Sequence, residues 1–421
     1  MKRVFRIGRE GKIKDVGLQG PWEQSAALDV DARVALIQAL IPLGLAAVSE
    51  VLEEDVRGLA GERYSRTGGL PGLARWGSQR GSVYLADQKI PITYTRVRDL
   101  PRNREVPLAT YQRLQVPRSA DEGLFRKVLL GLSCRRYQES AEAVPEAFGL
   151  SPSSVSRRFI RASERSLRVL CERRLDGEEF VAVVLDGKSF ASESMVVALG
   201  ITLDGRKVPL GFVQTATENE KACAAFLREL QDRGLQANRG LLFVIDGSKG
   251  LRKAVQTVFG DKALVQRCQW HKRENVVSYL PKTQQGAWRK RLQGAYARPT
   301  YAEARAELLK LRRELALQNE SAAKSLDEGF EETLTLHRLG LFEKLGASLK
   351  TTNCLESVNS QIARTTRRVG RWRNSNQKQR FLAAALLDIE PRLRRIKGRR
   401  HLPLLQAALE RETSQREAKA A

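Results

Sequence analysis

Three carboxylate residues stand out by their type and by their place along the chain. Asp186 and Asp246 each follow a short apolar run and precede a glycine, and Glu356 lies in the segment Asn353-Cys-Leu-Glu356-Ser-Val-Asn359-Ser. Carboxylate oxygens are the hard ligands that Mg²⁺ prefers. Two metal ions about 4 Å apart can activate an attacking oxygen and stabilise a leaving one. The residues therefore predict a phosphoryl-transfer site holding Mg²⁺ or Mn²⁺, with two ions.

Each carboxylate also has a plainer interpretation. An Asp-Gly pair after an apolar strand is usually a turn, and a Glu three residues after Asn353 has the spacing of a helix cap. Their occurrence together in one segment favours catalysis. Asn353 and Asn359, or Ser360 in place of the latter, would share the helix face of Glu356 and shape the site.

The elements that must position these residues begin near residue 179. Strand-like runs, separated by turn residues or by segments of helical spacing, are expected at 180–185, 194–202, 208–215, 241–245 and 263–268. Helices are expected at 218–235 and 251–259. This order is that of a ribonuclease H-like α/β core with a mixed five-stranded sheet. Its first and fourth strands are neighbours about 5 Å apart, which would bring Asp186 and Asp246 to adjacent strand ends.

An all-helical insertion is expected at 273–350, before the segment of Glu356. Apolar residues recur there at helical spacing behind the capping box Thr300-x-x-Glu303. The two expected apolar faces are Trp288, Leu292 and Tyr296, and Leu308, Leu311 and Leu315. After a basic stretch at 364–400, residues 401–421 are expected to be a frayed, charged tail.

The amino-terminal part suggests contacts with DNA. Helices interrupted by Pro42 and Gly44 are expected at 27–60, and a basic β-hairpin at 82–97 with its turn at Asp87 and Gln88. The stretch 135–160 resembles a helix-turn-helix, with Ser151 as the cap of the second helix and Val155, Phe159 and Ile160 buried. An ordinary helix pair with a solvated basic face fits equally well. The residues predicted to face DNA are Ser153, Ser154, Arg157, Arg158 and Arg161.

Charge and composition narrow the class of protein. The formal net charge of +25 and the pI of about 10.2 favour a polyanionic partner, with nucleic acid first. Five scattered cysteines argue against a disulfide framework and are expected to be reduced. No apolar run is long enough for a membrane span, and no signal peptide is recognisable, so we expect a cytoplasmic protein without a membrane partner.

The sequence is similar to the Mutator-type insertion-sequence transposases, a family with a DDE catalytic triad on a ribonuclease H-like fold and a helical insertion before the Glu. The resemblance covers about residues 60 to 385. The segments that carry it are Leu185-Asp-Gly-Lys188, Val244-Ile-Asp-Gly-Ser-Lys-Gly-Leu251, Arg267-Cys-Gln-Trp-His-Lys272 and Asn353-Cys-Leu-Glu-Ser-Val-Asn359.

Two further groups of residues are expected beside the triad. Cys268 and His271 form a Cys-x-x-His pair, which we expect to shape the site or contact DNA; a structural zinc is a weaker alternative because no second ligand pair is present. Trp270 could stack on a base or lie in the core. A positive stripe at helical spacing would hold the phosphate backbone, or be only a solvated face. Its members are Arg364, Arg367, Arg368 and Arg371, with Arg373, Lys378 and Arg380 as an extension.

The resemblance implies that the protein binds terminal inverted repeats, cleaves their ends and joins the freed 3′-hydroxyl to target DNA. Pairing of two ends implies a homodimer or a higher homo-oligomer, acting on double-stranded DNA in the nucleoid if the source is bacterial. The alternatives are a catalytically silent DNA-binding descendant and another ribonuclease H-like nuclease. We expect an amino-terminal DNA-contacting region, a helix-turn-helix region, a first core segment, the insertion, a catalytic helix with a basic segment, and the tail. Their bounds are 1–118, 119–175, 176–272, 273–350, 351–400 and 401–421.

Overall fold

The computed structural model divides the chain into two compact units, residues 1–124 with 134–155, and residues 125–133 with 156–421. The backbone is described at 4–7, 13–16, 30–64, 69–85, 88–115, 120–135, 137, 150–190, 193–215, 219–367, 369 and 371–420. Side chains are described from residue 45 onwards, and not at a few positions next to the gaps. Most of the predicted first helix and turn of the helix-turn-helix, 138–149, lies outside these residues.

The first unit is built around a long helix and a hairpin. Helix α2 (Val30–Ala60) is continuous, so the predicted interruption at Pro42 and Gly44 is wrong. The predicted hairpin is confirmed, although it is longer than expected: β3 (Leu73–Leu85) pairs antiparallel with β4 (Gln88–Asp99). Its core contains Val48, Leu52, Val56, Val83 and Val97. The remaining elements are β1 (Val4–Ile7), β2 (Ile13–Val16), β5 (Arg104–Val106) and α3 (Ala109–Leu114).

Helix α5 (Pro152–Glu172) begins where the sequence predicted, with Pro152 in its first turn. The Ser151 hydroxyl accepts a hydrogen bond from the Ser154 amide at 3.4 Å. Val155 and Phe159 are buried, as predicted, but Ile160 is 36% exposed. The buried face of the helix is narrower than expected, because it contains residues 155 and 159, one helical turn apart, and leaves residue 160 at its border. Helix α4 (Ala120–Leu129) precedes this region.

The second unit contains a five-stranded mixed sheet with the order β10-β9-β6-β7-β8. The five expected strands are all present, and β6 lies between its parallel partner β9 and its antiparallel partner β7. Along β6, Val184 belongs to one core cluster, whereas Val183 and Leu185 belong to the other, as the two-residue period of a strand requires. The strands are β6 (Phe180–Phe190), β7 (Glu193–Thr202), β8 (Lys207–Thr215), β9 (Leu241–Ile245) and β10 (Ala263–Arg267).

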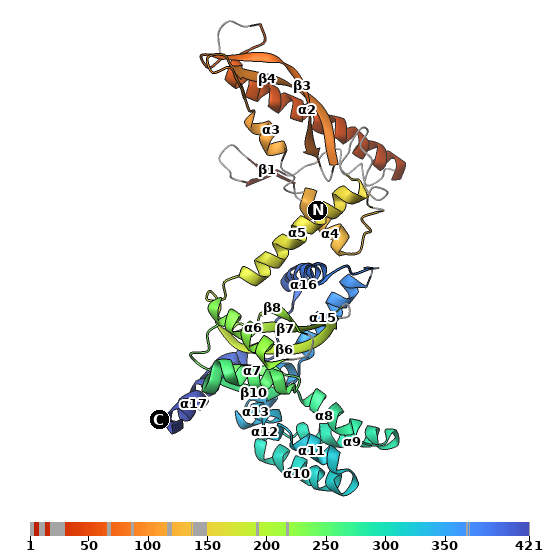
Figure 1. Ribbon diagram of the computed structural model, residues 1–421, viewed down its shortest axis with the longest axis vertical. Helices are drawn as coiled ribbons and strands as arrows, with labels where there is room; N and C mark the ends of the chain where they lie inside the picture. The colour runs from red at the N-terminus through yellow and green to blue at the C-terminus, as the bar shows by residue number, and fades with distance from the viewer. Residues whose placement is uncertain are drawn as a thin grey trace. The chain divides into compact units, whose positions relative to one another are not determined.

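Helices cover both faces of this sheet. Helices α6 (Glu220–Asp232) and α7 (Lys249–Phe259) pack on one face, where Figure 1 shows them lying across the strands. Helices α15 (Asn353–Thr366), α16 (Ser375–Ile389) and α17 (Leu402–Ala420) contribute to the core on the other face. Short 3-10 turns connect these elements: η2 (Gly260–Lys262), η3 (Glu390–Arg392) and η4 (Arg399–His401).

The predicted frayed tail is wrong, because α17 is part of the core. Leu402, Leu405 and Leu409 are buried, and the Arg416 guanidinium donates a hydrogen bond of 3.2 Å to the Ala263 carbonyl at the start of β10. The charged residues of this segment conceal an apolar face with helical spacing. The last helix therefore completes the sheet's hydrophobic layer.

The helical insertion is confirmed and has a core of its own. The capping box is present, since the Thr300 hydroxyl accepts from the Glu303 amide at 3.3 Å and the Glu303 carboxylate accepts from the Thr300 amide. The two predicted apolar faces pack into one cluster. Figure 1 shows α8 to α11 gathered at one end of the unit. The helices are α8 (Gln269–Ser278), α9 (Lys282–Tyr296), α10 (Tyr301–Gln318), α11 (Glu320–Asp327), α12 (Phe330–Thr333), α13 (Thr335–Arg338) and α14 (Phe342–Leu349).

His337 gives the insertion a predicted sensitivity to acid. Its buried ring stacks on Phe342 with centroids 3.6 Å apart, and Nε2 lies 3.1 Å from the Arg298 carbonyl. Burial lowers the pKa of His337 below its usual 6.5. The unfolded chain therefore binds the proton more readily, and the free energy of unfolding should fall as the pH drops below about 6.5. Urea unfolding of the wild type and His337→Gln across this range should show a weaker pH dependence in the variant; parallel curves would refute the assignment.

In the part of the chain that the structure describes, no helix combines the length and apolarity needed to span a membrane.

Candidate active site at the end of the parallel strand pair

Asp186 and Asp246 lie on neighbouring strands, where the parallel pairing of β6 with β9 stops. The last paired residues are Leu185 and Ile245, and each aspartate is the next residue along its chain. The expectation that both occupy strand ends is only half correct. Strand β6 continues past Asp186 to Phe190 because β7 still pairs with it. Asp186 therefore belongs to a strand held by hydrogen bonds, with 7% of its surface exposed.

Asp246 begins the turn from β9 to α7. Its carboxylate accepts a hydrogen bond of 3.0 Å from the Ser248 amide, and the Ser248 hydroxyl caps α7. The turn requires Gly247, whose φ is +124° and at which a Cβ atom would lie 2.7 Å from Arg267 Nε. The plain interpretation of Asp246 as a turn residue is therefore correct as local structure. One carboxylate oxygen is used in the turn, which is compatible with a second role for the other oxygen.

The chain enters the helical insertion and returns from it at the same place, beside the end of β9. Glu356, which follows this return, therefore lies at the sheet edge that carries Asp186 and Asp246. The Cys268 amide donates to the Ile245 carbonyl at 2.7 Å, and the next amide, that of Gln269, donates to the Lys350 carbonyl at 3.0 Å. Residue 350 is thereby fixed beside the end of β9, three residues before α15 begins. The helix cap is Thr352 and not Asn353, so the capping-box alternative for Glu356 is wrong.

Glu356 is partly buried and has a specific neighbour. The Thr352 hydroxyl lies 3.4 Å from Glu356 Oε1 and 3.8 Å from Cys268 Sγ. Of the two asparagines predicted to shape the site, Asn359 is buried but Asn353 is exposed. Asn359 lines a cavity of about 120 Å³ together with Lys188 and Trp372. Asn353 begins α15 and points away from the protein interior, which does not support a site-shaping role.

Two basic side chains accompany the carboxylates. Burial lowers the pKa of Lys188, and the charges of Asp186 and Glu356 act against this shift. Burial also lowers the pKa of the His271 ring, but Cys268, Asp186 and Asp246 together raise it above its usual value. The His271 Nδ1 atom is buried without a hydrogen-bond partner among the described residues. Lys188 thus interacts electrostatically with Asp186 and Glu356, and His271 with Asp186 and Asp246, so that Asp186 is common to both groups.

The carboxylates are neighbours without being closely gathered. Within the described ranges, no three His, Cys, Asp or Glu side chains form a group that could hold one metal ion. Cys268 is fully buried, and Trp270 is 42% exposed, so the core alternative for that tryptophan is wrong. Its ring contacts the edge of the His271 ring, with centroids 4.8 Å apart. Trp270 is thus free to contact a partner.

Sequence reasoning assigned no role to Lys188, Thr352 or Arg267. Lys188 follows Asp186 by two residues, and the two-residue strand period puts both on one face. Arg267 is buried; its guanidinium donates to the Gly247 carbonyl and, at 2.7 Å, to the Glu328 carbonyl of the insertion. Lys188 could have been found from its spacing. The other two depend on contacts with residues 61 and 84 positions away, which no local pattern reveals.

The predicted DNA-facing residues are only partly at the surface. On α5, Ser153, Arg157 and Arg161 are exposed and Ser154 is partly exposed. Arg158 is a correction, because it shares the inward face with Val155 and Phe159 and is 4% exposed. Two unpredicted arginines, Arg165 and Arg168, continue the exposed face.

The stripe after Glu356 is also shorter than predicted. Arg364, Arg367 and Arg371 are exposed, but α15 ends at Thr366, so the three do not lie on one helix. Arg368 lies outside the described residues. Lys378 and Arg380 are buried: Lys378 Nζ lies 2.8 Å from Glu193, and Arg380 donates to the Ser163 hydroxyl at 2.8 Å. They are structural residues and do not extend the stripe, although Arg373 is exposed.

Comparison with known proteins decides the family. The model of the family described as "Transposase, Mutator family" matches residues 38–394. The chain belongs to the Mutator family of transposases. This Mutator-family chain is 27% identical over 273 residues to the transposase for insertion sequence element IS256 in transposon Tn4001 of Staphylococcus aureus, covering 62% of this chain and 67% of that protein.

Two transposases of Rhizobium meliloti are also similar to this Mutator-family chain. The transposase for ISRM5 is 29% identical over 286 residues, or 66% of this chain and 69% of the relative. The transposase for ISRM3 is 26% identical over 332 residues, which cover 76% of this chain and 80% of the relative. The family match spans the sheet, the insertion and helices α15 and α16, so it includes all three carboxylates.

Proposed function

We propose that the protein is a DDE transposase that binds the terminal inverted repeats of an insertion sequence, cleaves DNA strands there and transfers the freed ends to target DNA. The observation that carries this proposal is the position of Asp186 and Asp246 immediately after the last paired residues of two parallel neighbouring strands, within a chain of the Mutator family. Glu356 approaches the same edge through the contacts of Cys268 and Lys350. We assign the sheet and its insertion to the ribonuclease H-like fold, and the first five sequence regions to the corresponding parts; residues 402–420 form α17 of the core.

The donor set suits Mg²⁺ or Mn²⁺. Asp186, Asp246 and Glu356 supply carboxylate oxygens, which hard divalent ions prefer, and Cys268, whose Sγ lies 3.8 Å from the Thr352 hydroxyl, is fully buried. Two bound ions would activate the attacking water or 3′-hydroxyl and stabilise the leaving oxygen.

The chain's own cations would position the DNA at this edge. Lys188, which interacts electrostatically with both Asp186 and Glu356, can donate a hydrogen bond to a phosphate oxygen. Trp270 offers an exposed ring on which a base can stack. Arg364, Arg367 and Arg371 place positive charge after the helix of Glu356. These groups contact the backbone and one base, so they fix the register of the substrate without reading its sequence.

Recognition of the repeats is assigned to other parts of the chain. The exposed residues Ser153, Arg157 and Arg161 of α5 are one proposed set of contacts with duplex DNA. The hairpin of the first unit is a separate one. Because two element ends must be brought together, a homodimer or a higher homo-oligomer is the proposed assembly. Its proposed place of action is on DNA in the cytoplasm, which is the nucleoid if the source is bacterial.

The test is strand cleavage and joining on a labelled duplex that carries the element's own end, with Mg²⁺ or Mn²⁺, for the wild type and Asp246→Asn. The proposal expects metal-dependent products from the wild type and none from the variant, while both bind the duplex equally. Binding without cleavage by the wild type, with end pairing verified, would identify a catalytically silent DNA-binding protein. Cleavage of any structured duplex regardless of the end sequence would identify a different nuclease.

A further inference from the structure

A basic groove lies in the second unit, near the turn that joins β7 to β8. It has a volume of about 940 Å³ and is lined by five Lys or Arg residues and a single acidic residue, Glu343. The five cations are Lys344, Arg394, Arg395, Arg399 and Arg400, and all are exposed. An open groove with this charge provides a surface for a polyanion.

The groove is at the opposite end of the sheet from the candidate active site. The β7–β8 turn follows Thr202, which pairs with Phe180 at the start of β6, whereas Asp186 lies six residues further along that strand. At about 3.3 Å per residue, the two ends are separated by roughly 20 Å along the strand. The groove is therefore a separate surface and not an extension of the carboxylate edge.

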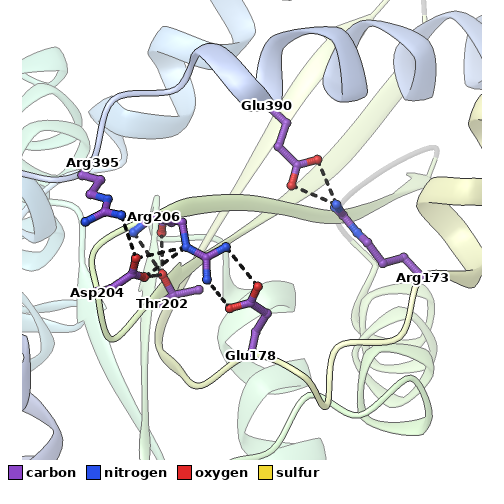
Figure 2. Close-up of polar contacts among 7 residues, drawn as sticks. All are labelled: Arg173, Glu178, Thr202, Asp204, Arg206, Glu390 and Arg395. Carbon is purple, nitrogen blue, oxygen red and sulfur yellow. Dashed lines mark hydrogen bonds and ion pairs between the residues drawn. The ribbon is translucent and has the colours of Figure 1, made fainter. Parts of the chain in front are cut away.

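Figure 2 shows how the groove's backbone is anchored through one of its arginines. Arg395 forms an ion pair of 3.2 Å with Asp204 in the β7–β8 turn. Asp204 also pairs with Arg206, which in turn donates to Glu178 at 3.0 Å. At the other end of the same segment, Arg173 donates to both oxygens of Glu390 at 2.8 and 2.9 Å. These charged contacts fasten residues 390–395 to the sheet.

Backbone contacts fix the rest of the groove wall. The Ile396 amide donates to the Gly205 carbonyl at 3.0 Å, and the Ser348 hydroxyl donates to the Lys397 carbonyl at 3.0 Å. Gly398 has a φ of +80°, and a Cβ atom there would lie 2.2 Å from the Lys344 carbonyl oxygen. The wall is consequently formed before any ligand binds, so little conformational entropy is lost on binding.

Several cations of this wall have no acidic partner. Among the described residues, Lys344, Arg394, Lys397, Arg399 and Arg400 form no salt bridge, although arginines elsewhere in the unit are widely paired. Like charges held close together repel one another, and an external row of phosphates would relieve this repulsion while releasing counterions.

We propose that this groove is a second binding surface for the phosphodiester backbone of duplex DNA, beyond the DNA held at the carboxylate edge. The proposal rests on the proposed function for its choice of DNA. Exposed arginines donate to phosphate oxygens in pairs. The groove presents no Phe, Tyr or Trp side chain for base stacking, and the Nε2 atom of its one ring, His401, accepts a hydrogen bond from Arg400 at 3.1 Å. Its binding is therefore independent of sequence, which suits flanking or target DNA.

The test compares two triple variants with equal loss of charge. The groove variant is Arg394→Gln with Arg399→Gln and Arg400→Gln; the control is Arg228→Gln with Lys262→Gln and Lys310→Gln, which are exposed on α6, η2 and α10. Fluorescence anisotropy would measure binding of a mixed-sequence duplex of roughly four helical turns over a range of salt concentrations, in EDTA so that no strand is cut. Equal thermal unfolding midpoints would verify that both variants fold.

The groove variant should bind about tenfold to a hundredfold more weakly. The slope of its log affinity against log salt concentration should become less negative by about 2 to 3, because each phosphate contact contributes about −0.9 to this slope. In the control variant, the changes in log affinity and in the salt slope should each be less than a third of those in the groove variant. Equal changes in both variants, no change in either, or a loss confined to single-stranded RNA would overturn the proposal. The binding measurement in EDTA does not depend on catalysis. A wild type that is inactive in the separate cleavage assay with Mg²⁺ or Mn²⁺ would therefore refute the proposed function but leave the binding result valid. If the groove triple variant is unstable, Lys344→Gln with Arg394→Gln, on two separate segments, gives the same test.

Discussion

Glu356→Gln is expected to reduce strand cleavage by about a thousandfold or more while leaving DNA binding and folding unchanged. Metal ions supply several kcal/mol of transition-state stabilisation, and each 1.4 kcal/mol corresponds to about a tenfold change in rate. Glutamine keeps the size of the side chain and its contact with the Thr352 hydroxyl, 3.4 Å from Oε1 in the wild type, but it removes the charge that a divalent ion requires. The loss should therefore be chemical and not structural.

The matched control is Glu307→Gln on α10, a partly exposed glutamate of the insertion without an ion pair among the described residues. Single-turnover cleavage at saturating protein would separate the catalytic step from binding. If Glu356→Gln cleaves as fast as the control variant, then Glu356 is a structural residue of α15. The third carboxylate would then have to be sought elsewhere at the same edge.

Leu405→Ala should lower the free energy of unfolding by about 2 to 5 kcal/mol, the usual range for truncating a fully buried leucine. Leu405 has no exposed surface, and it belongs to the core cluster that covers one face of the sheet. The adjacent Leu404 is 46% exposed on the same helix. Leu404→Ala should therefore change stability by no more than about 0.5 kcal/mol.

Urea unfolding of both variants, followed by circular dichroism, provides the measurement. Both substitutions place alanine in the same helix, so their difference reports burial and not helix propensity. Equal small effects of the two substitutions would mean that α17 does not pack on the sheet in solution and that the residues after 401 act as a free tail.

The sheet could be predicted from the sequence because its strands are continuous apolar runs with clear ends. The run before Asp246 has this character, and β9 lies at the predicted residues 241–245. Strand β10 begins at the predicted Ala263 and ends at Arg267, one residue before the predicted end. The insertion was predictable for the corresponding reason, since its helices repeat apolar residues at the helical period. The capping box at Thr300 even gave the start of α10 correctly.

The failures concern side chains whose burial depends on distant partners. Arg158, Lys378 and Arg380 belong to basic segments, and a local pattern assigns such segments to the surface. In the structure Lys378 is paired with Glu193, 185 residues earlier, and Arg380 with Ser163, 217 residues earlier. A buried charge is tolerated only when it is paired, and the partner can be identified only from the folded structure. The same reasoning explains why the charged residues of α17 concealed a core helix.

The packing of α17 on the sheet also has a consequence for the order of folding. Gln406 of α17 donates to Glu179, 227 residues earlier in the chain, whereas the insertion's core is built from helices that follow one another directly. Contacts between near neighbours in sequence form quickly, and contacts across long loops form slowly. The helical insertion should acquire its native contacts first in refolding experiments, as a preformed module, and the sheet should become protected from solvent only when the last helix docks.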